Sequence, residues 1–189
     1  MTPTPFRFEP ELSPDDFMKL GQLSLRWSHT EHVIGNCLKV MLRLTDQEAI
    51  IMVFPLPFDQ RIQRMVRIAE INPPTAEVKE ALDELVYVMK GIQYVRNNVI
   101  HAVVVEDEKQ GYLFQLRNKE RSLTKVQIFE TEDLTNYAGH VALKLRFALG
   151  DKDGVHSYTL PERPEIPTFL RELMPSRSKP NSQPSPPGN

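Results

Sequence analysis

The stretch that decides the fold closes a long helical pattern and reads, at residues 93–102, Gln93-Tyr94-Val95-Arg96-Asn97-Asn98-Val99-Ile100-His101-Ala102. The apolar residues before it recur at spacings of four and three, at Val78, Leu82, Leu85, Met89 and Ile92. This spacing predicts a helix whose apolar seam faces the core. The same rhythm next reaches Arg96. Because arginine is almost never buried unpaired, we expect Arg96 to meet an acid, to open onto a cleft or to lie in a subunit interface.

A second polar side chain, His101, follows Arg96 by five residues. On an ideal helix this offset turns His101 by about 140° and moves it about 7.5 Å along the axis. The two side chains therefore flank one groove of the helix surface and do not stack. Asn97, four residues before His101, is expected on the same face as the histidine.

Glu31 is the second charge that the sequence places in an apolar seam, this time in the first long helix. One explanation is that Glu31 swings out past the edge of that helix. The other is that Glu31 pairs with Arg96, because two opposite charges that interrupt two core seams would offset each other's desolvation. Under the second explanation Glu31 is a structural partner of the Arg96 site.

Helix starts and changes of periodicity organise the rest of the chain. The expected helices cover residues 14–44, 45–54, 59–71, 75–102 and 131–150, and the expected strands cover residues 103–105, 112–116 and 125–129. The predicted fold is mainly α, an up-and-down helical bundle with a small antiparallel β hairpin or sheet inserted before the last helix. The third helix also carries a stripe of arginines at Arg61, Arg64 and Arg67, which indicates either a solvated face or a track for phosphates.

The composition is that of a soluble globular protein of 189 residues, with 40% hydrophobic and 25% charged residues. We expect one helical domain at residues 13–160 and a proline-rich, mostly disordered tail at residues 161–189, in which Phe169 to Met174 could form a docked helical turn. A net charge of −2 argues against wholesale electrostatic wrapping of nucleic acid. Residues 1–12 do not resemble a signal peptide, and no apolar run is long enough to span a membrane. We therefore expect a cytoplasmic protein without a membrane partner.

Several chemistries lack the residues they need. His29 and His32 lie three apart, but no second pair of acid and histidine has matching spacing, so no metal site is predicted. The sequence has neither a glycine-rich phosphate loop nor a nucleophile elbow. Cys37 lies among apolar residues and is expected to be a buried thiol. The Arg96 to His101 segment remains as the candidate site.

The segment Arg96-Asn97-Asn98-Val99-Ile100-His101 resembles the signature of HEPN domains, an arginine and a polar residue followed by a histidine. The surroundings are similar too, over roughly residues 14–150: a long first helix, a capped short helix, a third helix, the signature near the end of the next helix, then strands and a closing helix. Among HEPN proteins, the chain looks most like the bacterial toxin and abortive-infection members.

This resemblance implies a metal-independent endoribonuclease that needs no cofactor, works as a homodimer and leaves 2′,3′-cyclic phosphate ends on RNA. It implies that His101 exchanges protons with the ribose 2′-hydroxyl or the leaving oxygen, and that Arg96 holds the phosphate. Asn97 would orient the histidine or donate to the phosphate. Tyr94 and Asn98 are the expected substrate-binding residues, although Tyr94 could instead pack across the dimer. An antitoxin protein is a further implied partner.

The same residues also have an ordinary structural explanation. An arginine and a histidine near a helix end can cap the last carbonyl groups and satisfy a buried acid. Three readings therefore stay open: an active ribonuclease, a non-catalytic HEPN-like module that binds nucleic acid or dimerises, and an unrelated helical protein. The near-neutral net charge favours the second reading over the first.

Overall fold

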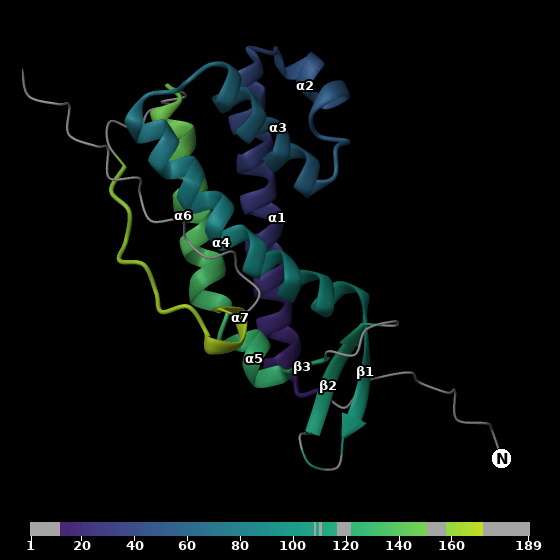
Figure 1. Cartoon of the computed structure of the whole chain (residues 1–189). Helices are drawn as coiled ribbons and strands as arrows, with labels where there is room; N and C mark the ends of the chain where they lie inside the picture. Colours follow the sequence, from purple (N-terminus) through teal and green to yellow (C-terminus); the bar gives the residue numbers. More distant parts are fainter. Residues whose placement is uncertain (1–11, 108, 110, 117–121, 151–157, 172–189) are drawn as a thin grey trace, which may run out of the picture.

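The computed structural model describes residues 12–107, 109, 111–116, 122–150 and 158–171. The described chain is mainly helical, with a small antiparallel sheet before the last helices, as the sequence predicted (Figure 1). The elements are, in chain order, α1 (Pro14–Leu42), α2 (Asp46–Met52), α3 (Phe58–Ile71), α4 (Ala76–His101), β1 (Ala102–Asp107), β2 (Gly111–Leu116), β3 (Ser122–Thr124), α5 (Lys125–Phe129), α6 (Glu132–Ala148) and α7 (Thr168–Arg171).

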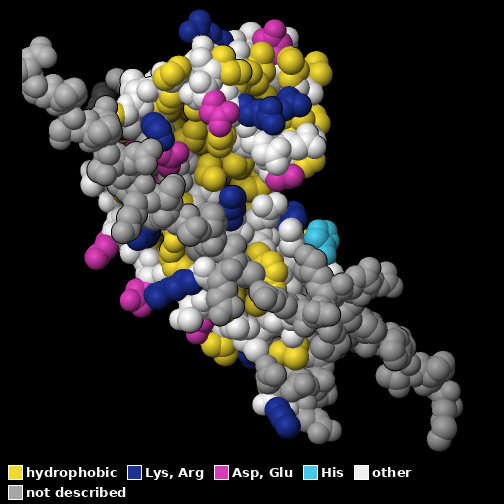
Figure 2. Space-filling view, in the orientation of Figure 1, with side chains coloured by type: hydrophobic (Ala, Val, Ile, Leu, Met, Phe, Trp, Pro, Cys, Tyr) yellow, Lys and Arg dark blue, Asp and Glu magenta, His cyan; other side chains and the backbone are white. Residues whose placement is uncertain are grey.

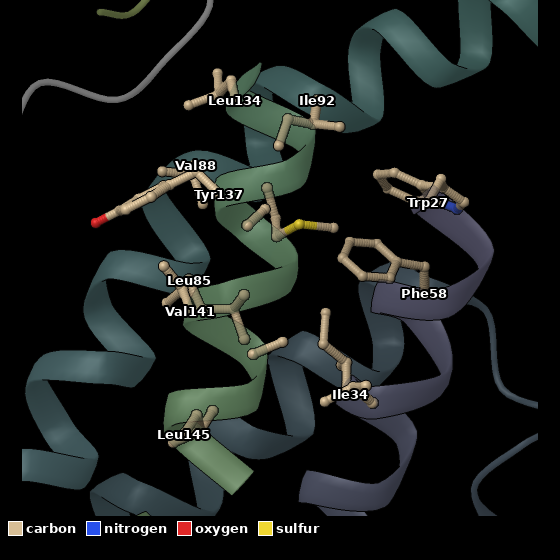
Figure 3. Close-up of a cluster of buried hydrophobic side chains, with 14 of the residues drawn as sticks. Trp27, Ile34, Phe58, Leu85, Val88, Ile92, Leu134, Tyr137, Val141 and Leu145 are labelled. Carbon is tan, nitrogen blue, oxygen red and sulfur yellow. The ribbon is translucent and has the colours of Figure 1, made fainter. Parts of the chain in front are cut away.

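The long helices α1, α4 and α6 form the centre of the molecule, and α6 packs against both of the others (Figures 1 and 3). Arg26 of α1 donates to Glu132 at the start of α6 over 2.6 Å. Further along both helices, the Cys37 thiol lies 3.6 Å from the carbonyl oxygen of Ala142. These two contacts show that α1 and α6 run parallel, and α4 runs in the opposite direction (Figure 1).

Apolar seams of the three helices meet in one core (Figure 3). The seam predicted for α4 is confirmed, because all five of its apolar residues are at most 3% exposed: Val78, Leu82, Leu85, Met89 and Ile92. Helix α3 joins this core through Phe58, whose ring centroid lies 4.9 Å from that of Trp27 in α1. Cys37 is fully buried, as expected.

Capping boxes fix where α1 and α2 begin. The Ser13 hydroxyl accepts from the backbone N–H of Asp16, and the Asp16 carboxylate accepts from the backbone N–H of Ser13. Thr45 and Glu48 exchange the same pair of hydrogen bonds at the start of α2. Each box satisfies two N–H groups that have no partner inside the helix. The helix starts predicted at Ser13 and Thr45 are therefore confirmed.

The hairpin predicted after α4 is present, with β1 and β2 antiparallel and Val104 opposite Phe114. The strand predicted at residues 125–129 is wrong, because these residues form the short helix α5. A helix begins here because of a further capping box, in which Thr124 and Gln127 satisfy each other's backbone N–H groups. The third strand, β3, ends at Thr124, one residue before α5 begins, and pairs with β2.

The packed part of the chain extends past the boundary predicted at residue 160. Residues 158–171 follow the surface of the bundle and end in α7 (Figure 1). Leu170 of α7 is fully buried in the core, and Phe169 is partly buried beside it. A docked helical turn is thus present at Thr168–Arg171, which covers the described part of the range 169–174 where one was expected. Residues 172–189 lie outside the described residues.

Apolar side chains also remain exposed at the far end of the bundle from the sheet. In Figure 2, hydrophobic side chains gather at the top of the view, where Figure 1 places α2 and α3. On α2 the exposed fractions are 63% for Ile50, 76% for Ile51 and 52% for Met52. Among the described helices, none is long and apolar enough to cross a membrane.

Candidate functional site

Arg96 lies where the core-facing seam of α4 meets its solvent-facing side, and its side chain is half-buried. The guanidinium carbon lies 5.7 Å from the centre of the Trp27 ring, across the gap to α1. Its Nη1 donates to the Asn97 carboxamide oxygen over 3.1 Å. The buried Nε has no hydrogen-bond acceptor among the described residues. The guanidinium is therefore held mainly by an aromatic face and one neutral side chain.

The charge of Arg96 is not neutralised within the described part of the chain, where no carboxylate lies within ion-pair distance. The predicted pairing of Glu31 with Arg96 is wrong. Glu31 instead accepts from the Trp27 indole N–H over 3.2 Å and lies 3.7 Å from Nη1 of Arg61. Glu31 is therefore connected to Arg96 only indirectly: Glu31 contacts Trp27, and Trp27 contacts Arg96.

His101 is the last residue of α4, and its side chain is exposed. It has no hydrogen bond or ion pair to any other residue that the structure describes. Asn97 lies one turn earlier and is half-buried. Helical spacing puts Asn97 and His101 on one face, and the Asn97 carboxamide accepts a hydrogen bond from the Arg96 guanidinium.

Asn98 cannot reach a substrate in this structure, because it is fully buried. Its Nδ2 donates to the backbone oxygen of Tyr94 over 2.8 Å, and its buried Oδ1 has no partner among the described residues. The expectation that Asn98 binds substrate is therefore wrong for this conformation. Tyr94 is partly buried and packs against the core of its own chain.

Arg96 borders a narrow hollow of about 10 Å³ between α1, α4 and α6. Its lining residues are Leu23, Ser24, Trp27, Ile92, Val95, Arg96, Val99, Ile100 and Thr135. A volume of this size holds at most about one water molecule and no nucleotide. His101 does not line it. The single chain thus brings Arg96 and Asn97 together and leaves His101 outside.

The arginine stripe of α3 does not form the uniform surface that its spacing indicates. Arg64 and Arg67 are exposed, but Arg61 is only 7% exposed. Its guanidinium donates to the backbone oxygens of Leu56, Phe54 and Glu31. The importance of Arg61 for the surroundings of Trp27 could not be read from the sequence, because its acceptors are backbone atoms in a loop and a neighbouring helix.

Comparisons with known proteins give no family for the chain: no family model, no curated protein and no solved structure matches it. Among the described residues, no group of three or more histidine, cysteine, aspartate or glutamate side chains is arranged to hold a metal ion.

Proposed function

We propose that this chain is a metal-independent endoribonuclease of the HEPN type that acts as a homodimer. The observation that carries the proposal is the half-buried guanidinium of Arg96, which no carboxylate neutralises in the described part of the chain. A half-buried charge without a partner is costly, and active sites are places where such a cost is retained. A phosphate group would supply the missing anion and could accept two hydrogen bonds from one guanidinium.

The neighbouring side chains suit cleavage of a phosphodiester in RNA. An exposed imidazole such as that of His101 can take the proton of a ribose 2′-hydroxyl or give one to the leaving 5′-oxygen. The attacked phosphate gains negative charge as the reaction proceeds, and a fixed guanidinium stabilises that charge. Asn97 lies on the face of His101 and could orient the histidine or donate to the phosphate. The products would carry 2′,3′-cyclic phosphate ends.

A second copy of the chain would complete this site. Ile100 of α4 is 45% exposed and lines the same hollow as Arg96. Exposed apolar side chains favour association, and a twofold interface at this side chain would bring the Arg96 and His101 of both chains into one cleft.

A non-catalytic HEPN-like module that binds nucleic acid or dimerises is the second candidate. It is favoured by one observation, the exclusion of His101 from the hollow that Arg96 lines. In that case Arg96 would contact phosphates, and His101 would have no chemical role.

The two candidates are separated by incubating the purified protein with mixed RNA in EDTA, beside His101→Ala and Arg96→Ala. The ribonuclease cleaves the RNA, and each variant lowers the rate by at least about 100-fold, the usual size of a lost general acid–base or charge-stabilising group. Arg67→Ala is the matched control, since Arg67 is exposed on α3. RNA binding without cleavage by the wild type, weakened by Arg96→Ala and unchanged by His101→Ala, would establish the binding module instead.

A role as a toxin or antiphage defence protein follows from the same proposal. Expression in bacteria should then arrest growth, and His101→Ala should relieve the arrest. Normal growth with the wild-type protein would count against such a role, although not against ribonuclease activity on a chosen RNA.

A further inference from the structure

The sole tryptophan of the chain connects Arg96 to the ion pair of Glu31 and Arg61. Trp27 is 3% exposed, and the face of its ring carries the Arg96 guanidinium at 5.7 Å. The indole N–H donates to Oε2 of Glu31 over 3.2 Å. The orientation of the ring therefore depends on where the Glu31 carboxylate is held.

Arg61 holds that carboxylate and ties it to the loop between α2 and α3. Its Nη1 lies 3.7 Å from Oε1 of Glu31 and donates to the Glu31 backbone oxygen over 3.2 Å. Its Nε and Nη2 donate to the backbone oxygens of Leu56 and Phe54 over 3.0 and 2.7 Å. A guanidinium with this many fixed acceptors, and only 7% exposed, has one orientation available.

The distribution of charge follows from these contacts. Glu31 is the carboxylate of Arg61, so the positive charge of Arg61 is compensated inside the fold. Among the residues that the structure describes, Arg96 contacts the π face of Trp27 and the Asn97 carboxamide and no carboxylate, so its charge remains available to an anion. A direct Glu31–Arg96 ion pair would have removed that availability.

We propose that Arg61 and Glu31 are positioning residues, which fix the Trp27 indole and through it hold the Arg96 guanidinium in the orientation that receives an RNA phosphate. This inference rests on the proposed function for its ligand, RNA. Cation–π contact is directional, because the attraction is strongest over the ring face. A tilt of the ring therefore moves or loosens the guanidinium, and affinity for the phosphate falls.

The test uses variants that keep the net charge, so that a change in affinity does not come from long-range electrostatics. Glu31→Asp shortens the side chain by one methylene, and it can no longer reach Trp27 and Arg61 together. Arg61→Lys keeps the positive charge and loses the planar fork. Arg67→Lys, at an exposed position of the same helix, is the matched control. Thermal unfolding confirms that each variant is folded, and Glu31→Asp serves if Arg61→Lys does not fold.

The measurement is the Kd of a labelled, uncleavable 2′-O-methyl RNA, determined in the wild-type background and in the Arg96→Ala background. Glu31→Asp should weaken binding about tenfold in the first background and less than about twofold in the second, because its effect passes through Arg96. Arg67→Lys should leave Kd unchanged in both. Equal effects of Glu31→Asp in the two backgrounds, or no effect in either, would overturn the inference.

The outcome is independent of cleavage. If RNA binds with this pattern and is not cut, the ribonuclease proposal fails and the positioning role stands. If RNA is cut, and the effects of Glu31→Asp and Arg96→Ala on Kd multiply in the double variant, the positioning role fails and the ribonuclease proposal stands. If the wild type binds no RNA, both proposals fail, since Arg96 then has no phosphate to hold.

Discussion

Arg96 interrupts an apolar seam, and the structure shows how the fold accommodates it. Its guanidinium rests against Trp27, while its buried Nε has no acceptor in the described chain. Cation–π contact recovers about 0.5–2 kcal/mol, less than the cost of an isolated buried charge. Arg96 conflicts with packing and meets no acid among the described residues, which fits its proposed role of binding a phosphate. Asn98, two residues on, is the contrasting case of a polar side chain that serves the fold.

Asn98→Ala should lower the free energy of unfolding by about 1–3 kcal/mol, because it removes the hydrogen bond to Tyr94 from a fully buried position. His101→Ala is the matched change at an exposed position of the same helix and should alter stability by less than about 0.5 kcal/mol. Urea unfolding of the two variants and the wild type measures both values. Equal stability of the two variants would show that Asn98 does not support the end of α4.

The sequence could reveal which residues are unusual, but not which residues they contact. The positions of Arg96 and Glu31 in apolar seams are visible in the pattern of residues. The partner of Glu31 is not, since Arg61 is 30 residues away and is buried only because backbone oxygens of the α2–α3 loop meet it. Asn98 could not be assigned to the core either, because its neighbours Arg96 and Asn97 remain partly accessible.

At the scale of elements, the close approach of α1 to the α2–α3 loop depends on Gly35. A Cβ atom at this position would lie 2.7 Å from the Phe54 ring. Gly35→Ala should therefore destabilise the protein by about 1–3 kcal/mol, since the ring must move. Gly21→Ala, on the same helix with open space around it, should instead be neutral or stabilise by up to about 1 kcal/mol. Thermal unfolding compares them, and a stabilising Gly35→Ala would contradict the packing described.

The start of α1 is joined to α5 by Asp16 and Lys125, whose side chains lie 3.0 Å apart. The hydrogen bond from Lys125, with help from Ser13, lowers the pKa of Asp16 below its ordinary value of 3.8. The ionised carboxylate therefore stabilises the folded state above pH 3.8, and this contribution is lost as the pH falls through the lower, folded-state pKa.

Asp16→Asn should accordingly reduce stability at neutral pH. The difference from the wild type should shrink as the pH falls below 3.8 and vanish below the folded-state pKa. Urea titrations over a series of pH values measure this difference. A difference that stays constant down to low pH would mean that the carboxylate charge is not involved.

Helix starts were the most predictable elements, because caps are local. Ser13 and Thr45 each satisfy backbone groups three residues away, and both were identified from the sequence. The strand expected at residues 125–129 failed for the same reason, since Thr124 and Gln127 form a cap that outweighs a short apolar alternation. The burial of Leu170 depends on a distant surface and could be anticipated only as a docked turn.

At the scale of the whole molecule, the proposal requires two copies. Ile100→Asp places a charge on the exposed apolar side chain that lines the same hollow as Arg96, where Ile100 is 45% exposed. It should convert the protein to monomers in light-scattering chromatography and lower RNA cleavage at least about tenfold at equal concentration, because charge burial at an interface core is costly.

Ile51→Asp is the matched control, since Ile51 is 76% exposed but lies on α2. It should leave both the oligomeric state and cleavage unchanged. A wild-type protein that is monomeric and fully active, or an Ile100→Asp variant that remains an active dimer, would contradict the shared site.

The most direct test of the ribonuclease proposal compares two oligonucleotides in EDTA, one entirely ribose and one with a single 2′-deoxy residue at the preferred cleavage position. The ribose oligonucleotide should be cut to a 2′,3′-cyclic phosphate end, and the single deoxy substitution should abolish that cut, because the 2′-hydroxyl is the nucleophile. His101→Ala should cut neither. Cleavage of both oligonucleotides by the wild type, or equal cleavage by His101→Ala, would contradict the proposal.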